Sequence, residues 1–264
     1  MSLREVAPGL RLYVSDEGSG DAIVFLHALG TDSSIWQPQR AQLVRTHRVV
    51  CIDAPGHGGS PLWPAVSLQG LAEAVWRVAD QLGVARIALV GTSMGAVVAL
   101  RAAALQPARV DRVVLCAARL VRGGAQGHDL ARRSASALQG DLAEVADAMV
   151  ERWFPPPAQV PDAIRRQVRE LVLRTSPAGY AACAQACSAY DLSAELALLQ
   201  QRCWLVAGEH DEQVPAHFEA LGRACPAARV VLVRGAGHFP NLERPALFNA
   251  LLAEETGSRQ ARQA

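Results

Sequence analysis

Short apolar runs alternate along the chain with amphipathic stretches of helical length. Most of the apolar runs show no strict alternation of polar and apolar residues, which is typical of strands buried on both faces of a parallel sheet. The stretches between them predict helices that cover such a sheet. The predicted strands are Leu10–Val14, Ala22–Leu26, Arg48–Ile52, Arg86–Val90, Val110–Leu115, Cys203–Val206 and Arg229–Val233. The predicted helices are Ser67–Leu82, Ala96–Leu105, Ala216–Ala224 and Glu243–Glu254.

The strand pattern is interrupted between residues 120 and 200. This segment is rich in alanine and arginine, has consecutive prolines at 155–157 and contains no convincing strand. Its apolar residues recur at helical spacing, as in Ile164, Val168 and Leu171. We therefore predict a helical lid inserted into an α/β core. The predicted parts are 1–119 for the first part of the core, 120–200 for the lid and 201–264 for the second part of the core.

Composition places the chain among ordinary globular proteins. Half of its 264 residues are hydrophobic, 19% are charged, and the formal net charge is +1. The sequence has no basic stripe interleaved with aromatics, no apolar run near the roughly 20 residues that span a bilayer, and no signal peptide in MSLREVAPGL. We expect a soluble, cytoplasmic protein without a nucleic-acid or membrane partner. The oligomeric state stays open, a homo-oligomer included.

The six cysteines do not indicate a metal site. Cys183 and Cys187 are four residues apart in a helical pattern, but they have neither flanking histidines nor a second cysteine pair. Without a secretory signal, reduced thiols are expected rather than disulfides. The sequence therefore predicts no metal and no cofactor.

The sharpest signal for chemistry is Gly91-Thr92-Ser93-Met94-Gly95, a G-x-S-x-G motif between a predicted strand and a predicted helix. So tight a turn strains the serine backbone, and the flanking glycines remove side chains that would collide. The turn presents Ser93 Oγ beside a helix N-terminus, which favours developing negative charge. The competing interpretation is a serine that only caps the helix. The context favours Ser93 as the nucleophile.

A serine hydroxyl needs a neighbouring base to take its proton. His238 follows the last predicted strand in a turn-rich segment from which a side chain can reach the serine. Asp211 follows the preceding strand and is the predicted carboxylate that orients the histidine, with Glu209 as a close rival. The chain order Ser93, Asp211, His238 is that of the α/β-hydrolase triad. We therefore predict an α/β-hydrolase fold: a mostly parallel sheet flanked by helices, with the lid inserted between strands 6 and 7 of that fold.

Acyl transfer also needs N–H donors for the oxyanion. Met94, directly after the nucleophile, is predicted to supply one donor, and Leu29, in the turn after an early strand, the second. His27, in the same turn, is expected to brace the loop through hydrogen bonds. A serine at the nucleophile position favours acyl chemistry over the alkyl-ester chemistry of relatives that carry aspartate there.

Further motifs extend over nearly the whole chain, the lid included. They are His27–Trp36 (HALGTDSSIW), Asp53–Ser60 (DAPGHGGS), Gly91–Gly95 (GTSMG), Val113–Cys116 (VVLC), Arg152–Pro155 (RWFP), Ser176–Cys183 (SPAGYAAC) and Gly237–Pro245 (GHFPNLERP). Together they resemble 3-oxoadipate enol-lactonases, α/β-hydrolases of the β-ketoadipate pathway for bacterial aromatic catabolism. The resemblance implies hydrolysis of a small lactone or ester, with 3-oxoadipate enol-lactone as the leading substrate. Ala117-Ala118-Arg119 and His27-Ala28 depart from that family's pattern where substrate would be held, so the acyl group stays open.

An enol-lactone that carries a carboxylate needs a cation and an apolar wall in its site. The candidate cations are Arg119, Arg122 and Arg152, and the candidate walls are Trp36 and Trp153. For each arginine the competing interpretation is a solvated or ion-paired surface residue. For each tryptophan the alternative is simple packing.

Other functions fit the same triad. A general carboxylesterase, a carbon–carbon-bond hydrolase or a cofactor-free perhydrolase would keep it and change the acyl group. A non-catalytic receptor for a small ligand can also retain an intact triad. Turnover of a chromogenic ester, lost on Ser93→Ala, separates an enzyme from a receptor.

Overall fold

The computed structural model describes residues 2–140, 142–212, 214–225 and 227–256, so residues 257–264 of the predicted second core part lie outside the described residues. Eight strands form one sheet in the order β1-β2-β4-β3-β5-β6-β9-β10. Their bounds are β1 Ser2–Ala7, β2 Leu10–Glu17, β3 Ala22–Leu26, β4 Arg48–Ile52, β5 Ile87–Thr92, β6 Val110–Cys116, β9 Arg202–Gly208 and β10 Ala228–Val233. β2 pairs antiparallel with β1 and β4, and all other neighbours in the sheet are parallel. The predicted mostly parallel sheet is confirmed, and its predicted strands correspond to β2–β6, β9 and β10.

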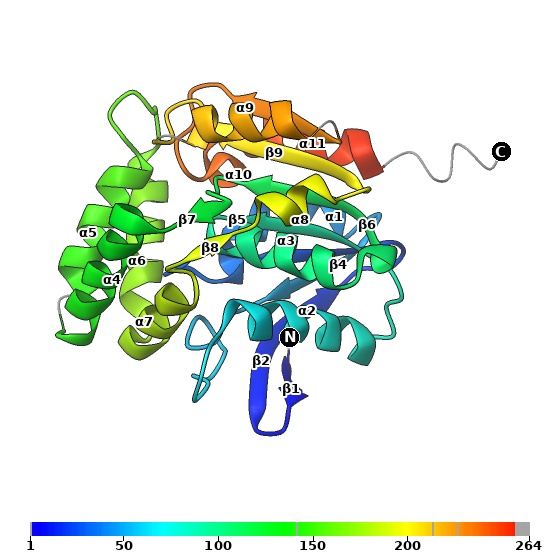
Figure 1. Cartoon of the computed structure of the whole chain (residues 1–264), viewed down its shortest axis with the longest axis horizontal. Coiled ribbons are helices and arrows are strands. Elements are labelled where there is room, and N and C mark those ends of the chain that lie inside the picture. Colours follow the sequence, from blue (N-terminus) through cyan, green and yellow to red (C-terminus); the bar gives the residue numbers. More distant parts are fainter. Residues whose placement is uncertain (1, 141, 213, 226, 257–264) are drawn as a thin grey trace.

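Helices cover both faces of this sheet, which explains why the strands are apolar on both sides. On one face, shown in front in Figure 1, lie α2 and α3, with α8 and α9. The opposite face packs against α1 and α11. Alternate strand residues point to the two cores: Val24 to the first, and Ile23 and Phe25 to the second. The bounds are α1 Gln37–Leu43, α2 Leu68–Gln81, α3 Met94–Leu105, α8 Ser193–Ala197, α9 Val214–Ala224, α10 Pro240–Glu243 and α11 Pro245–Thr256, with short 3₁₀ helices η1 Ser33–Trp36 and η2 Pro107–Arg109.

Between β6 and β9 the chain forms a group of helices at one end of the sheet (Figure 1, green to yellow-green). These helices are α4 Gly124–Leu138, α5 Leu142–Trp153, α6 Asp162–Arg174 and α7 Pro177–Ala186. The sequence predicts no strand in this segment, and this is wrong for a short antiparallel ladder, β7 (Val121–Arg122) with β8 (Tyr190–Asp191). Two-residue strands are too short to leave a periodicity. No described helix is both long and apolar enough to cross a bilayer.

Candidate active site

Ser93 lies at the sharp turn between β5 and α3. Its φ of 54° is in the left-handed region, where a side chain is strained. A hydrogen bond from Ser93 N to Cys116 O, 2.8 Å long, holds the turn against β6. A Cβ at Gly91 would overlap the Gly95 backbone, and one at Gly95 would overlap the carbonyl of Leu26. The strained turn that the motif predicts is therefore present, and only glycine fits on either side of it.

His238 and Asp211 form a buried, hydrogen-bonded pair. Nδ1 of His238 lies 3.1 Å from Oδ1 and 3.0 Å from Oδ2 of Asp211. Because a carboxylate only accepts, the imidazole proton is on Nδ1, and Nε2 is left as an acceptor. Nε2 is buried and has no hydrogen-bond partner in the described part of the chain. It is the free basic nitrogen that a general base requires.

Glu209, the rival for the orienting role, faces away from this pair. Its carboxylate accepts a 2.9 Å hydrogen bond from Gly235 N, and its side chain is 42% exposed. The structure pairs Asp211, and not Glu209, with the histidine. Glu209 instead ties the end of β9 to the turn after β10.

A buried carboxylate that the sequence did not single out holds the histidine loop. Glu243 accepts hydrogen bonds from Gly237 N at 2.7 Å and from Phe239 N at 2.8 Å, on either side of His238. Burial raises the pKa of the Glu243 carboxyl, and the two backbone donors oppose that rise. Glu243 had been predicted only as the first residue of a helix. An acid five residues after the histidine, in a segment with several turn residues, was the available signal.

Trp153, at the end of α5, joins the inserted helices to the same loop. Its carbonyl accepts a 2.9 Å hydrogen bond from His238 N. Its indole stacks on the imidazole with 5.6 Å between ring centroids and 5° between planes. A Cβ at Gly237 would overlap the Trp153 carbonyl, so this close approach needs glycine. Trp153 therefore lies at the site, as predicted, and packs directly against the imidazole.

A cavity lies between the ends of the strands and the inserted helices. It holds about 690 Å³ of empty space, part of it open to solvent, which is the size of a small-molecule site. Ser93, Asp211 and His238 line it together with Leu29 and Met94. Within the described residues, the N–H groups of Leu29 and Met94 have no intramolecular acceptor. No group of three or more described His, Cys, Asp or Glu residues is arranged to hold a metal ion.

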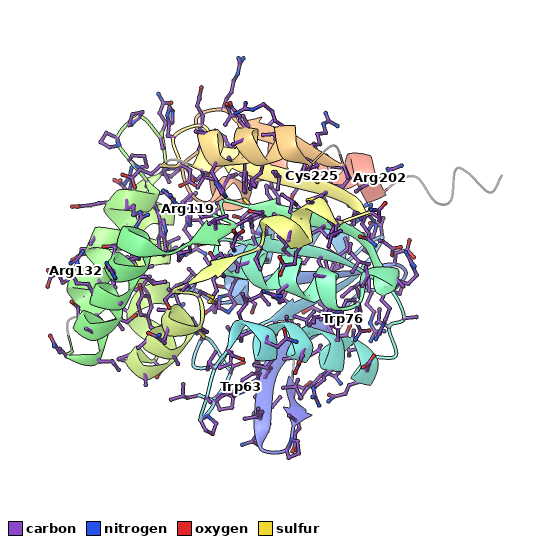
Figure 2. The ribbon with its side chains drawn as sticks, in the orientation of Figure 1. Trp63, Trp76, Arg119, Arg132, Arg202 and Cys225 are labelled. Atoms are coloured by element: carbon purple, nitrogen blue, oxygen red, sulfur yellow. The ribbon has the colours of Figure 1, made fainter. Side chains whose placement is uncertain are left out.

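Four arginines line this cavity. Three were predicted from the sequence, Arg119, Arg122 and Arg152, and one was missed, Arg133 on α4. Arg133 comes directly after Arg132, whose side chain is 74% exposed and points outward, and sequence alone does not tell the two apart (Figure 2). Crowding of positive charge is evident at Arg119, since burial, then Arg152, then Arg122 lower its pKa.

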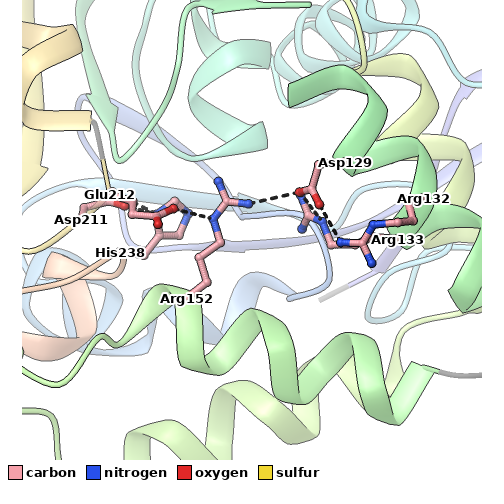
Figure 3. Close-up of polar contacts among 7 residues, drawn as sticks. All are labelled: Asp129, Arg132, Arg133, Arg152, Asp211, Glu212 and His238. Atoms are coloured by element: carbon pink, nitrogen blue, oxygen red, sulfur yellow. Dashed lines mark hydrogen bonds and ion pairs between the residues drawn. The ribbon is translucent and has the colours of Figure 1, made fainter. Parts of the chain in front are cut away.

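The ion pairs of these arginines are long and shared, as Figure 3 shows. Arg152 bridges two acids, with Nε 3.4 Å from Glu212 Oε2 and one terminal nitrogen 3.4 Å from Asp129 Oδ2. Arg133 Nε lies 3.2 Å from the same Asp129 oxygen, and its side chain is only 14% exposed. One aspartate thus serves more than one arginine, which leaves positive charge at the cavity wall.

Trp36 was predicted to form an apolar wall for substrate, and this prediction is wrong. Its side chain is fully buried and does not line the cavity. The indole packs against Phe25, with 5.0 Å between ring centroids, and against Phe248 at 6.0 Å. The 3₁₀ helix η1 directs Trp36 into the core beneath α11, where it is a packing residue.

Known proteins with similar chains or structures include hydrolases with different names. A 3-oxoadipate enol-lactonase from Acinetobacter baylyi is 29% identical over 243 residues, which cover 90% of each chain. The structure of an enol-lactonase from Burkholderia xenovorans LB400 matches with a TM-score of 0.88 at 29% identity, over 95% of this chain and 98% of that one. A thermophilic esterase from Thermogutta terrifontis, with malate bound, matches with a TM-score of 0.87 at 25% identity, over 93% of this chain and 92% of that one.

These similarities agree on hydrolase activity and fold and differ in substrate. The sheet order and the strained serine turn agree with that result. The model of the alpha/beta hydrolase family matches residues 23–251, most of the chain, and the chain therefore belongs to the alpha/beta hydrolase family.

Proposed function

We propose that this protein hydrolyses a small lactone or ester through an acyl-enzyme on Ser93. One observation carries the proposal: the buried His238–Asp211 pair leaves Nε2 free in the cavity that also contains the strained serine. A nucleophile, a base and an orienting carboxylate in one cavity are the parts of a serine hydrolase.

The proposed reaction has two halves. Ser93 Oγ attacks the acyl carbon while its proton passes to His238 Nε2, and Asp211 stabilises the imidazolium that forms. The amides of Leu29 and Met94 donate to the oxyanion. Collapse of the intermediate breaks the carbon–oxygen bond, and the imidazolium protonates the leaving oxygen. Water then attacks the acyl-enzyme with His238 as base, which releases the acid and restores the serine.

The proposed substrate is a lactone that carries a carboxylate, with 3-oxoadipate enol-lactone of the β-ketoadipate pathway as the leading case. Arg119, Arg122, Arg133 and Arg152 give the cavity wall the positive charge that such an anion requires. Trp153 supplies a flat apolar surface beside the imidazole. The names of two similar proteins support the same substrate class.

A neutral ester is the second candidate. Leu130, Met149 and Val214 give the cavity an apolar side as well, and one structurally similar protein is an esterase. Carbon–carbon-bond hydrolysis, perhydrolysis and ligand reception have no separate observation in their favour. We also propose that the helices of residues 120–200 act as a lid, because α4 and α5 supply cavity-lining residues opposite Ser93.

The test is a comparison of kcat/KM over a panel of lactones and aryl esters, with and without a carboxylate. We expect 3-oxoadipate enol-lactone to give the highest value and 3-oxoadipate as product. A neutral ester of similar size that surpasses it would replace the enol-lactone assignment and leave the serine mechanism in place. Absence of turnover over the whole panel would contradict the enzyme itself.

A further inference from the structure

Two buried histidines outside the proposed triad join the loop of Leu29 to the loop of residues 53–60. The rings of His27 and His57 lie 5.3 Å apart. His27 Nε2 accepts a 2.8 Å hydrogen bond from Ala54 N, and His57 Nε2 accepts a 3.1 Å bond from Gly30 N. Each histidine thus reaches from its own loop to the backbone of the other loop.

These contacts determine where the imidazole protons lie. Because each Nε2 faces an N–H donor, each ring is neutral with its proton on Nδ1. His57 Nδ1 then donates to the carbonyl of Pro55 at 3.0 Å. His27 Nδ1 donates to the carbonyl of Ala28 at 2.8 Å. The two side chains make matching contacts and differ in which carbonyl receives the proton.

The Ala28 carbonyl has two further donors, both from Thr31. The hydroxyl of Thr31 donates to it at 2.9 Å and the backbone N–H at 3.1 Å. This carbonyl and the Leu29 N–H belong to one trans peptide group, so they point in opposite directions. Donors on the carbonyl of an amide fix its plane, and they polarise its N–H toward a stronger donor.

We propose that His27 and Thr31 are positioning residues of the oxyanion hole, which hold the Ala28 carbonyl so that the Leu29 N–H is oriented and polarised toward the oxyanion. The inference rests on the proposed acyl-enzyme mechanism. The full oxyanion charge exists only near the transition state, so the effect falls on kcat and not on ground-state binding. His57 braces the same loop, but its own donor goes to Pro55.

The chain offers a matched pair of variants, His27→Gln and His57→Gln. In each, the glutamine oxygen keeps an acceptor near the position of Nε2, and the Nδ1 donor is lost. Thr31→Val is a third variant that keeps the side-chain shape and removes only the hydroxyl donor. The readouts are kcat and KM with p-nitrophenyl acetate, together with the melting temperature of each variant.

We expect His27→Gln to lower kcat about 10-fold and Thr31→Val about 3-fold, with KM within about twofold of the wild type. These effects are smaller than the 10²–10³ of losing a direct oxyanion donor, because the Leu29 N–H itself remains. His57→Gln should lower the melting temperature to a similar extent as His27→Gln and keep kcat within about twofold of the wild type. The affinity for phenylboronic acid, which forms a tetrahedral adduct with an activated serine, should fall in parallel with kcat.

Equal losses of kcat in the two glutamine variants would show a purely structural role and overturn the proposal. If His27→Gln does not fold, Thr31→Val decides the question, and an unchanged kcat there overturns it. Failure of the underlying mechanism looks different, because it is seen in the wild type. Either the wild-type protein has no turnover, or its turnover survives Ser93→Ala, and in both cases this proposal falls with the mechanism.

Discussion

The two sides of the cavity are built differently. The cavity floor (Leu29, Ser93, Met94, Asp211 and His238) comes from loops at the ends of the strands, and backbone hydrogen bonds and close glycine contacts hold it in place. The cavity roof (Leu130, Arg133, Met149, Arg152 and Trp153) comes from α4 and α5. Its charged groups meet through long, shared ion pairs, and the Arg152 side chain is 41% exposed (Figure 3).

The contrast separates what the site does from what it accepts. In the floor, a small displacement misaligns the reacting groups, so its geometry needs support from every side. In the roof, exposed ion pairs add little to stability, so an arginine can change with small cost to the fold. We expect floor substitutions to abolish turnover of all substrates, and roof substitutions to change the preference among substrates.

The largest effect is expected at the nucleophile. Ser93→Ala should leave the fold intact, because the hydroxyl adds little packing at this turn, and should lower kcat by about 10⁴- to 10⁶-fold. The measurement is turnover of a chromogenic ester, with the melting temperature as the control for folding. A variant that keeps a tenth of wild-type activity would show that the nucleophile lies elsewhere.

The next effect tests the orienting carboxylate. Asp211→Asn should lower kcat by about three to four decades, because His238 loses the partner that holds its tautomer and stabilises the imidazolium. Glu209→Gln is the matched control, since Glu209 bonds only to the Gly235 amide in the described structure and should cost little. A greater loss for Glu209→Gln than for Asp211→Asn would reverse the assignment.

The roof should show a smaller, substrate-dependent effect. Replacing the arginine that binds the substrate carboxylate by methionine should lower kcat/KM for the anionic lactone by about 30- to 1,000-fold and leave a neutral aryl ester nearly unchanged. Arg119, Arg122, Arg133 and Arg152 are tested one at a time. Arg132→Met is the control, because this neighbour of Arg133 points to solvent.

The ratio of the two activities within each variant carries this test. If every arginine variant loses both activities equally, or loses neither, the roof does not recognise a carboxylate. The substrate would then be a neutral lactone or ester, and the contrast between roof and floor would rest on shape alone.

The smallest effect concerns stability and belongs to the floor. Burial, and then the neighbouring His27, lower the pKa of His57 from 6.5 to about 3. Below pH 6.5 the unfolded chain binds a proton that the folded chain refuses. This contribution to the free energy of unfolding is therefore complete above pH 6.5 and is lost as the pH falls toward 3, at up to about 1.4 kcal/mol per pH unit.

Denaturant unfolding between pH 4 and 6 measures this slope. His57→Gln cannot take up the proton, so its free energy of unfolding should fall less steeply with decreasing pH, by about one proton. His47, whose pKa burial also lowers, contributes in the same direction to both proteins and cancels in the comparison. Identical slopes would contradict a neutral, buried His57.

The sequence predicts the floor better than the roof, for a physical reason. Ser93, Asp211 and His238 each follow a strand, and parallel strands bring their ends together whatever the details of packing. Arg133 and Trp36 depend on which way a helical side chain points. Helical spacing does not show whether an arginine faces a cavity or solvent, and it does not show that η1 directs a tryptophan into the core. Glu243 was missed because a buried brace leaves no sequence motif.

The central claim is that Ser93 is a nucleophile activated by His238 and Asp211. A fluorophosphonate tests it directly, because it forms a stable covalent bond with an activated serine and is not released. Peptide mapping by mass spectrometry should find one adduct per chain, on the peptide that contains Ser93, formed in step with the loss of ester turnover and absent from Ser93→Ala. A protein that keeps its turnover while fully exposed to the reagent, or that carries its adduct on another residue, would contradict the account.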